Sequence, residues 1–183
     1  MKKIPTLFKR DEENRKYVTD ELAVLLPDDS VSTEKIDGTC VMFDGKRWWA
    51  RRELKPGASE PGGWQFVNFD ETTEKTIGWE PAENSGFYKY LLEAIELEDA
   101  AEQGTYELYG PKINGNPGGI EQHRLYRHGS RIPVYSWNPG WTADVVKRWV
   151  LALPAHVEGI VWWNEGEPIA KLKKRDVRPI GEA

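Results

Sequence analysis

The sequence predicts an α+β domain in which most strands pair antiparallel. Short runs of β-branched and aromatic residues, bounded by glycine, proline and asparagine turns, outnumber the segments whose apolar residues recur at helical spacing. Strands that follow one another through short turns favour antiparallel pairing. The chain has 183 residues, which is enough to bury a sizeable core, so we expect a single domain over residues 1–183.

The first elements are a predicted helix and two predicted strands. Residues 9–25 are charged at first and then apolar, which predicts a helix that ends near Pro27. The pattern then changes to short apolar runs that are typical of strands. We expect these strands over residues 31–36 and 40–43.

A hairpin and a long loop are predicted next. Asp44-Gly45 is a strong signal for a two-residue hairpin turn, so residues 46–52 are expected to form the return strand, with its two tryptophans on opposite faces. Residues 55–85 are rich in glycine, proline and polar residues and predict a long loop. Such long loops are unusual in a compact domain, which suggests a functional segment.

The middle of the chain predicts a second helix, over residues 86–102, with Gly104 as its stop. Its apolar residues recur at helical spacing: Phe87, Leu91, Ala94 and Ile95. Strands are expected over residues 105–109 and 125–126, and a loop rich in glycine and asparagine over residues 110–119.

The last third predicts three strands and a third helix. Thr142 is a candidate N-cap for a helix. The apolar face of this helix would hold Val145, Val146, Trp149, Val150 and Leu153. Strands are expected over residues 132–137, 159–163 and 169–173, the last two joined by a loop of hairpin length, residues 164–167.

Composition narrows the class of protein. Cys40 is the only cysteine, which excludes an internal disulfide and a CxxC metal site. No apolar run approaches the roughly 20 residues of a membrane span, and the N-terminus lacks the apolar core of a signal peptide. We therefore expect a cytoplasmic protein without a membrane partner.

Charge is unevenly distributed over a chain whose formal net charge is −5. Residues 171–178 carry five cationic residues against Asp176, a net of +4. Residues 86–103 carry five acidic residues against Lys89, a net of −4. This separation is compatible with a local phosphate site on an acidic protein.

The string Glu34-Lys35-Ile36-Asp37-Gly38-Thr39 is the first candidate site. A lysine at the end of a strand, before a glycine turn, can present its amine from a rigid element, and Gly38 lets a phosphate approach the backbone. A neutral amine is a nucleophile. The alternative is a surface lysine followed by a common Asp-Gly turn.

Two further candidate sites lie between residues 51 and 107. Arg51, Arg52 and Lys55 could hold phosphates, or they could be the solvated charges of a hairpin edge. Glu107 alternates with Tyr106 and Leu108. If these two pack in the core, Glu107 could accept a hydrogen bond from a ribose hydroxyl; otherwise it is an exposed acid.

The C-terminal part supplies three more candidates. Tyr135 or Trp137 could stack on a base, or pack in the core. Glu158 precedes an apolar strand and could hold a hard cation. Lys171 and Lys173 share one face of a strand, and two like charges repel unless an anion lies between them. The alternative is a solvated edge strand protected by lysines.

The order of these motifs resembles the covalent nucleotidyltransferases, the superfamily of ATP-dependent DNA ligases, RNA ligases and mRNA capping enzymes. The resemblance covers about residues 35–175. The string Glu107-Leu108-Tyr109-Gly110-Pro111 resembles the glutamate motif of nick-sealing phage RNA ligases. The string Lys35-Ile36-Asp37-Gly38-Thr39-Cys40 is similar to small ATP-dependent 5′-to-3′ RNA ligases of phages, bacteria and vertebrates, the family that the chain resembles most. The resemblance implies the ATP-grasp-like adenylyltransferase fold. Because few residues follow Lys173, we expect no C-terminal OB domain of the kind found in DNA ligases and capping enzymes.

The resemblance also implies a role for each candidate. Lys35 would attack the α-phosphate of ATP, and Lys171 and Lys173 would hold that phosphate. Arg52, with Arg51 nearby, would contact phosphate, and Glu107 would hold the ribose. Trp137, or else Tyr135, would stack on adenine, and Glu158 would help to bind Mg²⁺ or Mn²⁺. The expected nucleotide-binding residues are Lys35, Ile36, Arg52, Glu107, Trp137, Glu158, Lys171 and Lys173.

The implied activity is RNA ligation of the kind used in RNA repair. The enzyme would join a 5′-phosphate to a 3′-hydroxyl through lysyl-AMP and an adenylylated 5′ end. We expect it to be a monomer that is either cytoplasmic or encoded by a phage and active in the cytoplasm of the host. Many relatives carry a polar Asn or Arg at the position of Cys40, where the resemblance implies that a polar group helps the later, sealing steps. The alternatives are a GTP-dependent guanylyltransferase, a DNA ligase core, and a non-catalytic RNA-binding module.

Overall fold

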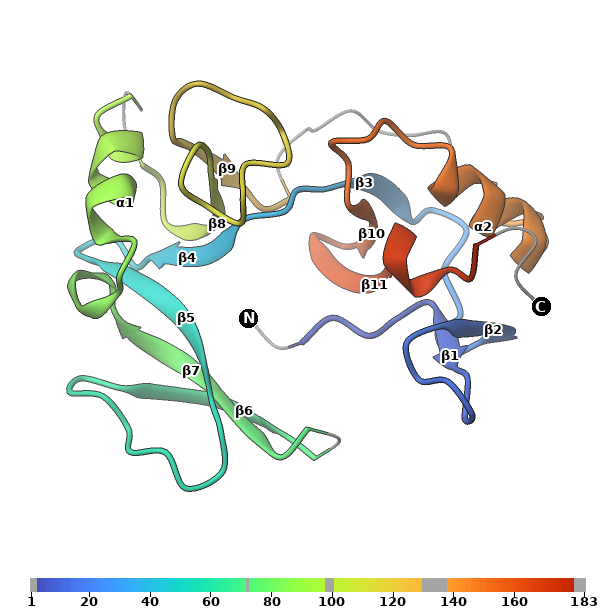
Figure 1. The fold of residues 1–183 in the computed structure, drawn as a ribbon, viewed down its shortest axis with the longest axis horizontal. Helices are drawn as coiled ribbons and strands as arrows, with labels where there is room; N and C mark the ends of the chain where they lie inside the picture. Colours follow the sequence, from blue (N-terminus) through green and yellow to red (C-terminus); the bar gives the residue numbers. More distant parts are fainter. Residues whose placement is uncertain (1–2, 72, 98–100, 130–137, 180–183) are drawn as a thin grey trace. The chain divides into compact units, whose positions relative to one another are not determined.

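The computed structural model describes residues 3–71, 73–97, 101–129 and 138–179 (Figure 1). These residues form a mixed α+β structure whose sheets are antiparallel, as the sequence predicts. The chain divides into two compact units. The first unit holds Met1–Lys3 and Asp37–Ser130, and the second holds Ile4–Ile36 and Arg131–Ala183. That residues 1–183 work as one nucleotidyltransferase domain stays a prediction.

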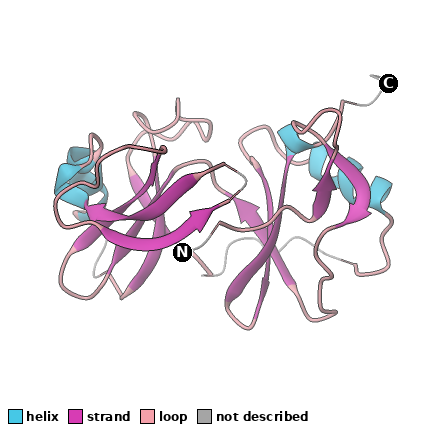
Figure 2. Cartoon of the chain, turned by 90° about the horizontal axis from the view of Figure 1, so that it is seen from below, coloured by secondary structure: helices cyan, strands magenta, loops and turns pink. Residues whose placement is uncertain are grey.

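A six-stranded antiparallel sheet forms the first unit, in the order β6-β7-β5-β4-β8-β9. Its strands are β4 (Thr39–Phe43), β5 (Trp48–Leu54), β6 (Gln65–Asp70), β7 (Lys75–Pro81), β8 (Gly104–Tyr109) and β9 (Arg124–Arg127). A 3₁₀ turn, η1 (Ala82–Asn84), leads to helix α1 (Tyr88–Ile95). Figure 1 shows α1 beside the β4 and β8 part of this sheet, and Figure 2 shows the helices in cyan and the strands in magenta from below.

The core of the first unit lies between α1 and the sheet. Leu91 and Ala94 of α1 pack against the strands because they share one face of the helix. The sheet contributes Val41, Tyr106, Leu108 and Leu125. Tyr106 and Leu108 therefore point into the core, and alternation along β8 turns Glu107 to the opposite face.

The second unit has a three-stranded antiparallel sheet in the order β11-β10-β3. Its elements are β1 (Phe8–Arg10), β2 (Val18–Leu22), β3 (Val31–Lys35), α2 (Ala143–Leu151), β10 (Gly159–Asn164), β11 (Glu167–Lys173) and the 3₁₀ turn η2 (Lys174–Asp176). Strands β1 and β2 form a separate antiparallel pair. A core of buried apolar side chains joins these layers: Phe8, Val146, Val150, Ile160, Trp162 and Leu172 are among them.

Two local predictions in this unit are confirmed. Thr142 caps α2, because its side-chain oxygen accepts a hydrogen bond from the N–H of Val145. Strands β10 and β11 form the expected hairpin, in which Asn164 pairs with Glu167. The two residues between them, Glu165 and Gly166, both have positive φ, as tight hairpin turns of this kind require.

The predicted helix over residues 9–25 is wrong, because this segment contains β1, a turn and β2. The side chain of Asp11 accepts hydrogen bonds from the N–H groups of Glu13 and Asn14, which stabilises a turn in the charged stretch. Lys9 and Glu21 then form an ion pair across the two strands. Local side-chain bonding and cross-strand pairing therefore replace helical hydrogen bonds here.

The predicted loop over residues 55–85 is also wrong beyond its first third, since β6 and β7 occupy most of the rest. The glycines and prolines that suggested a loop are concentrated in residues 56–63. Ile77 and Trp79 are buried in β7, which explains why this part pairs as a strand. Helix α1 is shorter than predicted and ends at Ile95. The described residues therefore contain two α-helices instead of the expected three.

The return strand β5 begins at Trp48, two residues later than predicted. The side chain of Asp44 accepts hydrogen bonds from the N–H groups of Lys46 and Arg47 and from the indole of Trp49. These bonds stabilise a turn that includes Lys46 and Arg47, so the strand begins after them. The strand predicted over residues 132–137 lies outside the described residues. No helix in the described part of the chain is long and apolar enough to cross a membrane.

Candidate active site

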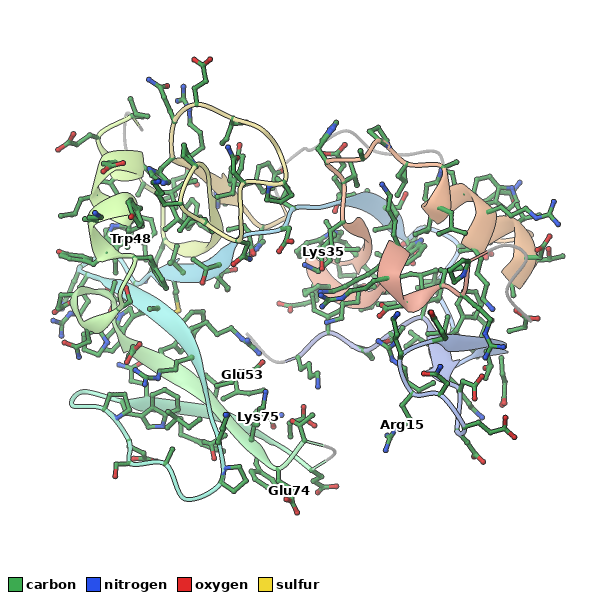
Figure 3. All side chains as sticks on the ribbon, viewed as in Figure 1. Arg15, Lys35, Trp48, Glu53, Glu74 and Lys75 are labelled. Atoms are coloured by element: carbon green, nitrogen blue, oxygen red, sulfur yellow. The ribbon has the colours of Figure 1, made fainter. Side chains whose placement is uncertain are left out.

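Two lysines flank one glycine across the sheet of the second unit. Gly159 of β10 pairs with Lys35 of β3 on one side and with Lys173 of β11 on the other. Residues opposite one another on neighbouring strands present their side chains on the same face, so both amines leave the sheet on one side. Figure 3 shows Lys35 at the end of β3, beside the hairpin of β10 and β11.

The glycine between the lysines is sterically required. A Cβ at Gly159 would lie 2.1 Å from the carbonyl oxygen of Leu172 and 2.7 Å from Cα of Lys173. Both contacts are with backbone, which cannot rotate away as a side chain can. Only glycine therefore lets β10 and β11 come this close beside the two amines.

Glu158 holds the two ammonium groups together. Its Oε2 lies 2.7 Å from Nζ of Lys35, and its Oε1 lies 2.5 Å from Nζ of Lys173. Arg175 is more distant, with a guanidinium nitrogen 3.9 Å from Oε1. The side chains of Lys35, Glu158 and Lys173 are between 12% and 19% exposed, so solvent screens this cluster only partly.

The backbone fixes Glu158 between the two flanking strands. Its N–H donates to the carbonyl oxygen of Lys35 (3.2 Å), and its own carbonyl accepts from the N–H of Lys174 (2.9 Å). The carboxylate therefore belongs to a rigid frame. Burial raises the pKa of Glu158, but the positive charges of Lys35 and Lys173 outweigh it, so that the pKa lies below its ordinary value. One carboxylate between two ammonium groups leaves the cluster with net positive charge.

Lys173 is positioned by a second buried acid. Asp176 accepts a hydrogen bond from the N–H of Lys173 (3.1 Å), and its other carboxylate oxygen lies 2.9 Å from a guanidinium nitrogen of Arg10. Asp176 is buried and η2 begins at this point. The end of β11 is thereby anchored where Lys173 leaves the sheet.

The predicted alternation of the C-terminal lysines is confirmed. Leu172 is fully buried, whereas Lys171 and Lys173 are half-buried on the other face of β11. Strand β11 is not a solvated edge at this level, because the N–H of Lys171 donates to the carbonyl of Pro5 and its carbonyl accepts from the N–H of Leu7. Edge protection is therefore a poor explanation for these lysines.

Lys174 differs from its neighbours. Its amine donates to the carbonyl oxygens of Leu153 (2.8 Å) and Pro154 (2.6 Å), which ties η2 to the segment after α2. Burial lowers the pKa of Lys174. Lys174 is thus a structural residue, and it gives a natural comparison for Lys173.

In the first unit, Glu107 is held by two partners. Its Oε1 accepts a hydrogen bond from the N–H of Gly38 (3.2 Å), and its Oε2 lies 3.0 Å from Nε2 of His128. The side chain is 14% exposed. Gly38 is needed for this contact, because a Cβ there would lie 2.3 Å from the carbonyl oxygen of Leu108. Asn114 donates to both Asp37 and the Gly38 carbonyl.

The arginines of β5 are engaged in ion pairs. Arg52 lies 2.7 Å from the buried carboxylate of Glu80 on β7, yet about half of its side chain is exposed. Arg51 lies 3.2 Å from Glu53, which also pairs with Lys75 at 3.2 Å (Figure 3). Arg52 therefore keeps guanidinium N–H groups that face solvent, and it remains the better candidate of the two for a phosphate.

The predicted site residues fall into three groups. Lys35, Glu158 and Lys173 meet in the second unit, where Ile36 and Lys171 also lie. Arg52 and Glu107 belong to the first unit. Tyr135 and Trp137, the candidates for stacking on adenine, lie outside the described residues. Sequence reasoning missed His128 and Asp176, which are not part of any motif and become partners only through strand pairing.

Glu158 alone is a poor metal site, because both of its oxygens face ammonium groups. Mg²⁺ is usually held by one or two carboxylates together with substrate phosphates, so the residue fits a metal that arrives with a nucleotide.

Comparison with known proteins gives no match to a family model and no match to a curated protein. The function is therefore inferred from the geometry of the lysine cluster.

Proposed function

We propose that this chain is an ATP-dependent RNA ligase of the adenylyltransferase fold that forms lysyl-AMP on Lys35. The observation that carries the proposal is the contact of Lys35 and Lys173 with one carboxylate, Glu158, on one face of a sheet. A nucleophilic amine beside a second cation is the arrangement that attack on a phosphate requires. Neither a random surface lysine nor an edge strand accounts for it.

The first step would be nucleotidyl transfer to Lys35. The Nζ atom attacks the α-phosphorus of ATP, a P–N bond forms, the bond to the β-phosphate oxygen breaks, and pyrophosphate leaves. The amine must lose a proton for this attack, and Glu158 Oε2, at 2.7 Å, is in reach to take it. A divalent cation, Mg²⁺ or Mn²⁺, would supply charge neutralisation of the triphosphate when it is bound.

The cations of β11 would stabilise the charge that develops on the α-phosphate. Lys173 is fixed at the end of the strand by Asp176, so it needs little reorganisation to act. Lys171 leaves the same face of β11 two residues earlier. In the remaining steps a 5′-phosphate of RNA would take the AMP, and a 3′-hydroxyl would displace it and seal the strand.

The other roles follow from the resemblance of the sequence motifs. Glu107 would accept a hydrogen bond from the ribose, Arg52 would contact phosphate, and Trp137 would stack on the base. Glu107 meets the condition set for this role, since Tyr106 and Leu108 do pack in the core. RNA with 5′-phosphate and 3′-hydroxyl ends is the proposed partner.

The test is incubation of the purified protein with α-labelled ATP and Mg²⁺ or Mn²⁺, followed by a denaturing gel. We expect a labelled band that Lys35→Ala abolishes, while circular dichroism shows that the variant is folded. A band with labelled GTP alone would replace the proposal with guanylyl transfer. Sealing of nicked DNA in preference to nicked RNA would indicate a DNA ligase core. No band with either nucleotide would favour a non-catalytic RNA-binding module.

A further inference from the structure

A second cluster, in the first unit, contains the donor atoms of a transition-metal site. The thiol sulfur of Cys40, a carboxylate oxygen of Glu107 and a ring nitrogen of His128 all lie within 4.8 Å of one another. All three residues are half-buried. Nε2 of His128 lies 3.0 Å from Oε2 of Glu107. Neither Lys35 nor Glu158 belongs to this cluster.

The three residues are brought together by strand pairing. Cys40 on β4 lies directly opposite Glu107 on β8. The N–H of His128 donates to the carbonyl of Thr105 on β8 at 3.0 Å, which continues the pairing of β9 with that strand. Thr105 and Glu107 are two residues apart and share a face. Two donors therefore come from the neighbouring strands β4 and β8 and the third from the residue that follows β9, on the face of the sheet opposite the core.

Each of two donors is oriented by another contact. Nδ1 of His128 lies 3.0 Å from the hydroxyl oxygen of Thr105, and Oε1 of Glu107 accepts a hydrogen bond from Gly38. When the Nδ1–H donates to Thr105, Nε2 carries its lone pair toward Glu107 and Cys40. A histidine whose second ring nitrogen is held by an oxygen is the usual arrangement at metal sites.

We propose that Cys40, Glu107 and His128 bind a zinc-class ion. A thiolate, an imidazole and a carboxylate suit Zn²⁺ and Co²⁺, whereas Mg²⁺ prefers oxygen ligands alone. In a tetrahedral zinc site neighbouring donors are about 3.3–3.6 Å apart, and these three donors, all within 4.8 Å of one another, can reach such separations by side-chain rotation. Three protein ligands leave the fourth position for water or an exogenous ligand. Binding releases the thiol proton of Cys40.

The test uses the complete, reduced chain after treatment with a chelator and removal of any affinity tag. Co²⁺ is titrated in while absorbance is recorded, because a cysteine-bound, four-coordinate Co²⁺ gives a sulfur charge-transfer band and visible bands. We expect one equivalent of Co²⁺ to produce both, and Zn²⁺ to displace it. We expect Cys40→Ser to lose the sulfur band and His128→Gln to weaken binding at least about 100-fold.

His156→Gln is the matched control, because His156 is exposed in the second unit and should bind Co²⁺ as the wild type does. Thermal melting without metal verifies that each variant is folded, and added Zn²⁺ should raise Tm in the wild type and in His156→Gln alone. No sulfur band in the wild type would overturn the proposal. So would unchanged Co²⁺ affinity in both Cys40→Ser and His128→Gln. Neither readout depends on lysyl-AMP formation, so this proposal and the proposed function fail separately.

Discussion

The amine of Lys35 and the carboxylate of Glu158 lie 2.7 Å apart, although β3 and β10 come from opposite ends of the chain. The same carboxylate reaches Lys173 at 2.5 Å. Glu158 therefore offsets the repulsion of two ammonium groups that would otherwise share one face unpaired. Its removal should therefore affect stability as well as chemistry.

Glu158→Gln should destabilise the fold by about 1–2 kcal/mol at neutral pH, a partial value because the cluster is not fully shielded from solvent. The pKa of Glu158 is lowered from 4.5. A carboxylate of lowered pKa contributes stability that is complete above its ordinary pKa and is lost as the pH falls through the lowered value. The difference in urea unfolding free energy between wild type and variant should therefore shrink below about pH 4.5.

Glu167→Gln is the control for this measurement, because Glu167 is exposed on β11. It should change the unfolding free energy by no more than about 0.5 kcal/mol at any pH. A penalty for Glu158→Gln that stays constant down to strongly acidic pH would show that the ion pairs with Lys35 and Lys173 do not stabilise the fold.

Lys173→Ala should reduce the yield of lysyl-AMP at least about tenfold, because it removes a cation that would stabilise the developing phosphate charge. Lys174→Ala should leave the yield within about twofold, yet lower Tm, because the Lys174 amine donates to two backbone carbonyls. The measurement is the yield of adduct at one early time point, beside a melting curve. Equal losses of adduct in the two variants would contradict the division of roles between these neighbours.

The sequence predicted that Lys171 and Lys173 share a face of their strand, because this relationship is encoded locally. Alternation along β11 placed Lys171 and Lys173 on one face, and the buried Leu172 confirms it. Alternation along β8 predicted that Glu107 points opposite to Tyr106 and Leu108, and the structure shows that these two face the core. These predictions needed only the period of a strand and the apolar character of the neighbouring residues.

The contacts made by strand pairing could not be predicted. Nothing in the sequence near His128 indicates that it would meet Glu107, and the single Cys40 offers no metal-ligand spacing.

The first predicted helix was wrong because Asp11 stabilises a turn through its side chain, which competes with helix formation. The loop predicted over residues 55–85 was wrong because the glycines and prolines of its first part are not typical of the whole segment, which also contains β6 and β7.

Gly159→Ala should destabilise the protein by about 2–3 kcal/mol, because the new Cβ would collide with the backbone of Leu172 and Lys173. Separation of β10 from β11 would also move Lys173 from Glu158, so the yield of lysyl-AMP should fall. Gly86→Ala is the matched control, since a Cβ there meets nothing within 4 Å. Urea unfolding of both variants checks the difference, and a neutral Gly159→Ala would contradict the close approach of the two strands.

Zn²⁺ should inhibit formation of lysyl-AMP if both proposals hold, because the metal and the ribose would compete for the carboxylate of Glu107. Cys40→Ser removes one metal ligand and leaves the carboxylate in place, so this variant should form the adduct at a similar rate but need at least about tenfold more Zn²⁺ for half-inhibition. His156→Gln should respond to Zn²⁺ as the wild type does. The rate is measured at fixed ATP and Mg²⁺ over a series of Zn²⁺ concentrations, and then at higher ATP. Because ATP also chelates Zn²⁺, only relief of the inhibition by ATP at constant free Zn²⁺ would place the competition at the nucleotide site. Identical inhibition of wild type and Cys40→Ser would show that Zn²⁺ acts elsewhere, such as on the carboxylate of Glu158.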